Sequence, residues 1–105
     1  MGVLFHPAPE ELELTAVMQA LSDPARRKVV AALAAEGERA CGTFELGVTK
    51  ATASHHFKVL REAGITLTRI DGVHRFLTLR RDDLDARFPG LLDAVLTAEP
   101  AGAVA

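Results

Sequence analysis

The sequence has no tryptophan or tyrosine and only one cysteine, Cys41. A single cysteine excludes a disulfide framework within the chain. No apolar run approaches the roughly 18 residues that a membrane-spanning helix needs. The first residues, MGVLFHPAPEELEL, have no basic flank before an apolar stretch, as a secretory signal would have. A cytoplasmic protein without a membrane partner is therefore expected.

The composition is typical of one folded domain. The chain has 105 residues, of which 49% are hydrophobic and 25% are charged, and these fractions favour a globular over a disordered chain. This length supports a modest core, which a partner subunit would strengthen. We predict an N-terminal arm over residues 1–9, a folded domain over 10–97 and a disordered tail over 98–105.

The net charge of −2 hides an uneven distribution along the chain. Residues 1–48 carry a net charge of −3, residues 49–81 carry +5 and residues 82–105 carry −4. A basic segment between acidic ends is typical of a surface that meets a polyanion such as nucleic acid. Chance clustering on a solvated face is the alternative.

Two helices are predicted in the first third of the chain. Residues 10–21 place apolar side chains on one helical face, with Pro9 suited to the first turn; this face consists of Leu14, Val17, Met18 and Leu21. The second helix begins at Pro24, after a cap from Ser22 or Asp23, and ends at Gly37. Its three basic residues, Arg26, Arg27 and Lys28, are predicted to face solvent.

A glycine turn then separates two further helical pieces. The first, RACGTFELG, is short and contains Gly42, a weak helix former, so an irregular helix is expected there. The second is predicted to begin after Thr49 as its cap, to run to Ala63 and to stop at Gly64.

The stretch ITLTRIDGVHRFLTL is rich in β-branched residues and contains Asp71-Gly72, the strongest short hairpin signal. A turn formed directly by this pair would place Leu67 opposite Phe76. After the hairpin, Asp82 is predicted to cap a short helical turn, and Pro89 to open a final helix. Phe88, Leu91, Leu92 and Val95 would line one face of that last helix.

Two helices joined by a glycine turn, followed by a hairpin, form the pattern of a winged helix-turn-helix. The fold class expected is mainly α with a β-hairpin wing. The second helix of such a motif enters the DNA major groove by its N-terminal end, where slim polar and basic side chains are needed. We therefore predict contacts with double-stranded DNA from Thr49, Lys50, Thr52, Ser54, His55 and Lys58 on the helix, and from Arg69, His74 and Arg75 on the hairpin.

Three segments in this order resemble the arsenic-repressor (ArsR) family of winged-helix transcriptional regulators: ALSDPARRKVVAAL, LGVTKATASHHFKVLREAG and RIDGVHRFLTL. The resemblance covers roughly residues 14–97. It implies a homodimeric repressor that binds a pseudo-palindromic operator until an effector releases it. It also implies a dimer interface built from the terminal helices, with Leu14, Val17, Met18, Leu21, Leu91, Leu92 and Val95 as its residues.

The adjacent histidines His55 and His56 do not share a helical face, so the pair is not expected to chelate a metal. His56 borders the apolar stripe and is predicted to be packed and hydrogen-bonded, which leaves His55 for DNA. No Ser/His/Asp or Cys/His arrangement accompanies them, and a catalytic base needs such an oriented partner. We therefore expect neither an enzyme nor a bound cofactor.

Cys41 bears on how the protein is regulated. Metal-sensing members of the family carry paired cysteines before the turn, or histidines and carboxylates on the last helix; this chain has one cysteine and no such histidine. Because thiolate sites need several soft ligands, no metal site is expected. Three readings of Cys41 stay open: an inert thiol, a redox sensor, or a ligand shared across subunits with His6. A small-molecule effector and a role as a protein-interaction module also remain alternatives.

Overall fold

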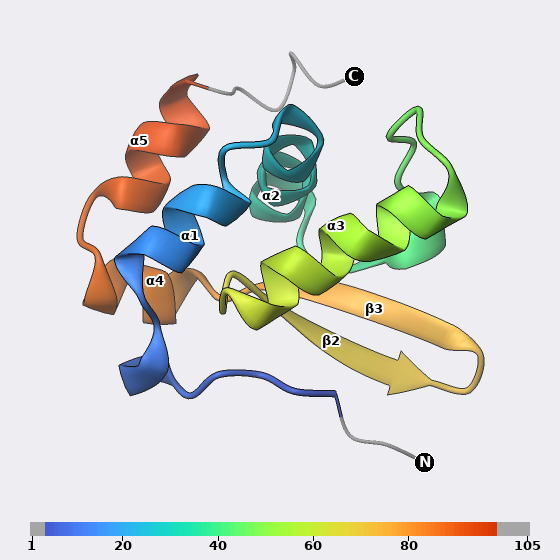
Figure 1. The fold of residues 1–105 in the computed structure, drawn as a ribbon, viewed down its shortest axis with the longest axis horizontal. Helices are drawn as coiled ribbons and strands as arrows, with labels where there is room; N and C mark the ends of the chain where they lie inside the picture. Colours follow the sequence, from blue (N-terminus) through green and yellow to red (C-terminus); the bar gives the residue numbers. More distant parts are fainter. Residues whose placement is uncertain (1–3, 99–105) are drawn as a thin grey trace.

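The computed structural model describes residues 4–98, and over this range it confirms the predicted fold class (Figure 1). The α-helices are α1 (Leu14–Ala20), α2 (Pro24–Glu36), α3 (Lys50–Glu62), α4 (Arg81–Arg87) and α5 (Leu91–Ala98). The strands are β1 (Arg39–Ala40), β2 (Thr66–Asp71) and β3 (His74–Leu79), and short 3-10 helices span Pro9–Glu11 and Cys41–Thr43. The sheet is antiparallel in the order β1-β3-β2, and its β2–β3 hairpin, the wing, runs alongside α3 and points away from α1, α4 and α5 (Figure 1).

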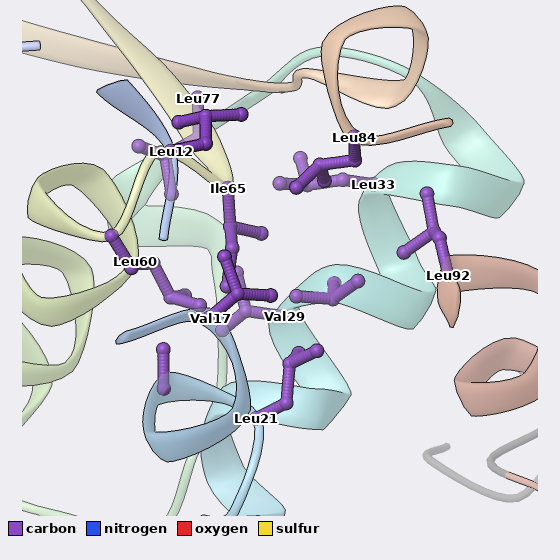
Figure 2. Packing of buried hydrophobic residues seen from close by; sticks show 13 residues of the cluster. Leu12, Val17, Leu21, Val29, Leu33, Leu60, Ile65, Leu77, Leu84 and Leu92 are labelled. Carbon is purple, nitrogen blue, oxygen red and sulfur yellow. The ribbon is translucent and has the colours of Figure 1, made fainter. Parts of the chain in front are cut away.

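One hydrophobic cluster joins the helices to the sheet (Figure 2). Leu60 of α3, Ile65 and Leu77 of β3 are fully buried at its centre. Val17 of α1 and Val29 of α2 pack against them, while side chains from α4 and α5 close the other end. Helix α3 and the wing are therefore anchored in the same core as the terminal helices α1 and α5.

The predicted boundaries of α2 and α3 are confirmed by their caps. The Asp23 carboxylate accepts a hydrogen bond from the Ala25 N–H at 2.7 Å, and Pro24 follows as the first residue of α2. Thr49 Oγ1 accepts the Thr52 N–H at 3.2 Å at the start of α3. Both helices are followed closely by a glycine with positive φ, Gly37 at 86° and Gly64 at 85°.

The prediction of one helix over residues 10–21 is wrong at its start. Pro9 opens only a 3-10 turn, Leu12 is extended with φ −66° and ψ 129°, and α1 begins at Leu14. The break lets the Leu12 side chain turn into the core, where it is 1% exposed. Burial of a leucine, about 1.5–3 kcal/mol, offsets the loss of one helical turn.

The short helix predicted before the glycine turn is not formed. Arg39 and Ala40 instead pair with Leu77 and Phe76 as strand β1, and only a 3-10 turn over Cys41–Thr43 remains of the helix. Glycines in this segment disfavour a helix, and the free edge of β3 offers its backbone groups a regular set of partners. The wing therefore belongs to a three-stranded sheet.

The hairpin register, which the sequence left open, is not that of a direct Asp71-Gly72 turn. Asp71 pairs with His74, so the two turn residues are Gly72 and Val73, and Leu67 faces Thr78 rather than Phe76. Gly72 has φ 63°, whereas no other kind of residue among 4–98 has a positive φ. A turn made by Asp71-Gly72 would favour positive φ at both positions, but glycine as the first turn residue suits a type II′ turn.

The caps of the last two helices differ from the prediction. Arg80, not Asp82, occupies the N-cap position of α4, and its Nε donates to the Asp83 carboxylate at 3.0 Å. The final helix, α5, begins at Leu91 rather than at Pro89, and Phe88 is the C-cap residue of α4. Ala98, assigned to the tail, is the last residue of α5, and the remaining tail residues lie outside the described range.

Gly64 provides a test of how tightly the end of α3 packs against the Leu12 side chain. A Cβ at this position would collide with the Leu12 side chain, and its φ of 85° is unfavourable for any other residue. We expect Gly64→Ala to lower the free energy of unfolding by about 2–4 kcal/mol, measured by chemical denaturation. Gly72→Ala has a similar φ but open space around the new Cβ, so it should cost only about 1 kcal/mol. Equal losses would contradict this packing.

Candidate nucleic-acid interface

The exposed side of α3 carries the side chains predicted to contact DNA. All six predicted helix residues are exposed: Thr49, Lys50, Thr52, Ser54, His55 and Lys58. The opposite side of α3 is fixed in the core by Leu60 and Ala63. Thr49 and Thr52 also bond to each other through their hydroxyls at 3.0 Å, which orders the first turn.

The adjacent histidines are divided as the sequence predicts. His56 is 7% exposed and its Nδ1 lies 3.2 Å from Nη1 of Arg26, which confirms that it is packed and hydrogen-bonded. His55 points to solvent on the exposed side of α3. Since Arg26 donates to Nδ1, the neutral His56 ring carries its proton on Nε2.

Arg26 connects three helices. The prediction that its side chain faces solvent is therefore wrong. Its Nε donates to the Ala20 carbonyl at 2.7 Å and its Nη2 donates to the Gln19 carbonyl at 3.2 Å. The third nitrogen reaches His56 on α3. One guanidinium thus satisfies carbonyls at the C-terminal end of α1, where a positive charge is favourable, and fixes α3 relative to α1 and α2.

The wing residues differ in how free they are. Arg69 pairs with Glu38 at 3.0 Å and lies over the Phe76 ring, 4.5 Å from its centroid; the Glu38 hydrogen bond raises its pKa. His74 and Arg75 are exposed near the hairpin tip. Figure 1 shows this tip and the N-terminal end of α3 pointing to the same side of the molecule. Arg69 therefore helps to hold the wing, while Arg75 is available to a partner.

Comparison with known proteins agrees with this geometry. Residues 21–69 match the model of a helix-turn-helix domain family. The HTH-type transcriptional regulator YceK of Bacillus subtilis (strain 168), described as uncharacterized, is 39% identical over 82 residues, which are 75% of this chain and 82% of YceK. The chain belongs to the family of helix-turn-helix transcriptional regulators.

Solved structures agree on the fold of this regulator. A possible transcriptional regulatory protein (fragment 1–100) from Mycobacterium bovis has a TM-score of 0.62 and 28% identity, over 81% of this chain and 88% of its own. An ArsR family transcriptional regulator has a TM-score of 0.63 and 24% identity, over 90% and 91%. The winged-helix fold predicted from the ArsR resemblance is thus confirmed.

Cys41 lies half-buried at the start of the 3-10 turn that precedes α3. Burial raises the pKa of its thiol, against the opposing charges of Arg75 and Arg61. A raised pKa lowers the thiolate fraction and with it the reactivity of the sulfur, which disfavours a redox sensor. Within residues 4–98, no three His, Cys, Asp or Glu side chains gather as a metal site would require.

The seven residues assigned to a dimer interface fall into two groups. Val17, Leu21 and Leu92 are 1%, 7% and 2% exposed because they fill the core of the single chain, so they are removed from that assignment. Leu14 and Met18 are 48% and 55% exposed, and Leu91 and Val95 are partly buried. The apolar surface left for a partner is therefore an α1–α5 face, which we define as Leu14, Met18, Leu91 and Val95.

His6 in the N-terminal arm is a contact that sequence reasoning missed. Its Nε2 accepts the Thr68 N–H of β2 at 2.9 Å, across 62 residues of sequence. Burial and the charges of Arg61 and Arg80 lower its pKa, so the neutral ring that accepts this bond is favoured. No local pattern indicates such a contact, since the arm has no helical or strand periodicity.

Among residues 4–98, every helix is too short or too polar to span a membrane.

The Arg26 bridge should be important for stability. In Arg26→Met, two carbonyls of α1 and the buried His56 lose their donor, and we expect a loss of about 2–4 kcal/mol in the free energy of unfolding. The measurement is chemical denaturation at neutral pH. Lys28→Met, an exposed position on the same helix, is the matched control and should stay within about 0.5 kcal/mol of the wild type. A harmless Arg26→Met would show that the bridge is dispensable.

Proposed function

We propose that this regulator is a homodimeric repressor, without catalytic activity, that binds a pseudo-palindromic operator in the cytoplasm. The observation that carries the proposal is the exposed face of α3. Its N-terminal half presents hydroxyls, an imidazole and Lys50 to solvent, Lys58 is exposed further along the helix, and no acidic residue occurs between Glu45 and Glu62. Such a surface suits the negative potential and the polar base edges of a DNA major groove.

The contacts would divide by their position. Thr52, Ser54 and His55 lie where base edges would be, since residues near the N-terminal end of a recognition helix reach them. Lys50, Lys58 and the Thr49 end of the helix would bind phosphates, as helix N-termini and cations do. His74 and Arg75 on the wing would hold the flanking backbone or minor groove, and Arg69 would support them through Glu38 and Phe76.

A dimer would use the α1–α5 face. Figure 1 shows α1 and α5 together on the side away from the wing tip, and exposed apolar groups there match the use of terminal helices in the family. A stable interface buries more than about 1,200 Å² in total. Two-fold symmetry would then require half-sites about 10 base pairs apart, or a multiple of this, on one side of the duplex.

Base and phosphate contacts should fail differently on mutation. His55→Ala should cost about 1–3 kcal/mol on the preferred sequence and relax preference at one position. Arg75→Ala should weaken binding to all sequences alike and reduce the salt slope by about one. Titration of specific and scrambled duplexes at several salt concentrations measures both effects.

The control for these titrations is Arg81→Ala. Arg81 of α4 pairs with Asp93 of α5 at 3.1 Å. Figure 1 shows α4 on the side of the molecule away from the wing tip, so DNA affinity should not change. Equal losses on both duplexes for His55→Ala would show that α3 does not read bases. Absence of duplex binding by the wild type would instead favour a winged-helix module that binds protein.

The dimer is tested by placing a charge on the α1–α5 face. Met18→Asp should convert a dimer into a folded monomer in sedimentation at micromolar concentration, because burial of an unpaired carboxylate is unfavourable. Ile70→Asp is the control: it changes an apolar wing residue that is 47% exposed, against 55% for Met18, and it should remain dimeric. A monomeric wild type would refute the dimer, and a dimeric Met18→Asp would move the interface elsewhere.

A further inference from the structure

A cavity of about 410 Å³ opens between the segment Cys41–Val48, α3 and the wing. Its apolar wall is formed by Phe44, Leu46 and Phe57, and its polar side chains include three cations, Lys50, Arg61 and Arg75. No Asp or Glu lines it. This volume and this mixture of apolar wall and few polar groups are those of a small-molecule site.

Two residues that line this cavity, Arg61 and Thr68, each have a buried polar atom without a hydrogen-bond partner. Arg61 is 9% exposed, and its Nε is buried without a hydrogen bond. Thr68 Oγ1 on β2 is buried in the same way, and both residues line the cavity. Within residues 4–98, every salt bridge of the structure involves other side chains, so the Arg61 charge has no carboxylate beside it.

Such an arrangement is costly unless a ligand completes it. A buried charge is normally paired, and a buried donor normally finds an acceptor. His6 cannot serve as this partner, since burial and the charges of Arg61 and Arg80 favour its neutral form and its Nε2 accepts the Thr68 N–H. What is missing beside Arg61 and the Thr68 hydroxyl is an anion that accepts hydrogen bonds from both.

The segment before α3 that forms one wall of the cavity is not a helix. Phe44 has extended backbone directly after the 3-10 turn, and Phe44 and Leu46 line this cavity on one side and a second hollow beside Lys28 and Arg39 on the other. Cys41, Phe44 and Leu46 are the partly buried side chains of the segment that pack against the core. A ligand that filled the cavity would gain the apolar contacts that a helix at this place would have made.

We propose that this cavity binds a small organic anion, a carboxylate with an apolar body, and that this ligand is the effector of the regulator. The carboxylate would accept hydrogen bonds from Arg61 and Thr68, while the body would pack on Phe44, Leu46 and Phe57. The effector role rests on the proposed function. Lys50, Ser54 and Arg75 line the cavity and also belong to the proposed DNA surface, so a negatively charged ligand bound beside them would repel the DNA phosphates and weaken operator binding.

The binding test uses the full chain and three probes: 2-naphthoate, its neutral analogue 2-naphthamide, and inorganic phosphate, each titrated in amide-resolved NMR. We expect saturable binding of 2-naphthoate at millimolar concentration or below, with shifts at Arg61, Thr68 and Phe44, and binding of 2-naphthamide about tenfold weaker. No saturable binding of 2-naphthoate, or equal binding of the amide, would overturn the proposal. Equally tight binding of inorganic phosphate would replace the carboxylate by a phosphate site.

Variants at Arg61 give a second, independent readout. Arg61→Met should weaken 2-naphthoate binding about tenfold or more, and Arg61→Lys should restore part of it. Because the unpaired charge is removed, Arg61→Met should also raise the melting temperature of the free protein, by about 4 °C or more. Arg81→Met removes a charge that is paired with Asp85 and Asp93, so it should neither raise the melting temperature nor change binding. A lower melting temperature in Arg61→Met would assign Arg61 a structural role instead.

The effector role is measured separately from the site. Addition of 2-naphthoate to a complex of the wild type with duplex DNA should lower fluorescence anisotropy, and the same addition to Arg61→Met should not. If 2-naphthoate binds but no duplex does, the proposed function fails while the site stands. If DNA binds and stays bound at saturating 2-naphthoate, the site stands and its role as effector site fails.

Discussion

The position of the recognition helix depends on one guanidinium. Arg26 binds two carbonyls at the end of α1 and the buried His56 of α3. Arg26 itself lies in the first turn of α2, which is capped by Asp23. The motif Ser-Asp-Pro-Ala-Arg is thus a device that turns the chain between α1 and α2 and then fixes α3 against both. Helix α1 also carries Leu14 and Met18 of the α1–α5 face, so the Arg26 contact connects α3 to the helix that we propose as part of a dimer interface.

The side of α3 that faces the segment Cys41–Val48 borders a cavity instead. This segment begins with a 3-10 turn that follows strand β1, and the cavity between it and α3 is lined by the cations Lys50, Arg61 and Arg75. Rigid support on the α1 side and an under-packed wall on the wing side suit a DNA reader that a ligand regulates, because the ligand can alter the wall without unfolding the core. The raised pKa of the Cys41 thiol favours a ligand over oxidation as the signal in this wall.

Local chemistry explains which parts of the structure could be predicted from the sequence. The ends of α2 and α3 follow from capping residues and glycines, and the exposure of His55 with the burial of His56 follows from helical periodicity. The failures share a different cause. Leu12 is not helical, and its side chain packs against Gly64. Residues 39–40 form a strand because they pair with the edge of β3. The roles of Arg26, His6 and Arg61 depend on partners that are far away in the sequence. An apolar stripe in the sequence does not show which of its residues are buried within the single chain. Val17, Leu21 and Leu92 were therefore assigned to a dimer interface although they belong to the core.

We propose that an exposed helix, fixed by the Arg26 bridge, reads a two-fold symmetric DNA site. Selection of duplexes from a random pool with the purified wild-type protein measures sequence preference, symmetry and spacing together. We expect enrichment of an inverted repeat whose half-site centres lie about 10 base pairs apart, or a multiple of this. Recovery of a pool with no enriched sequence, or of a single unrepeated half-site, would contradict it.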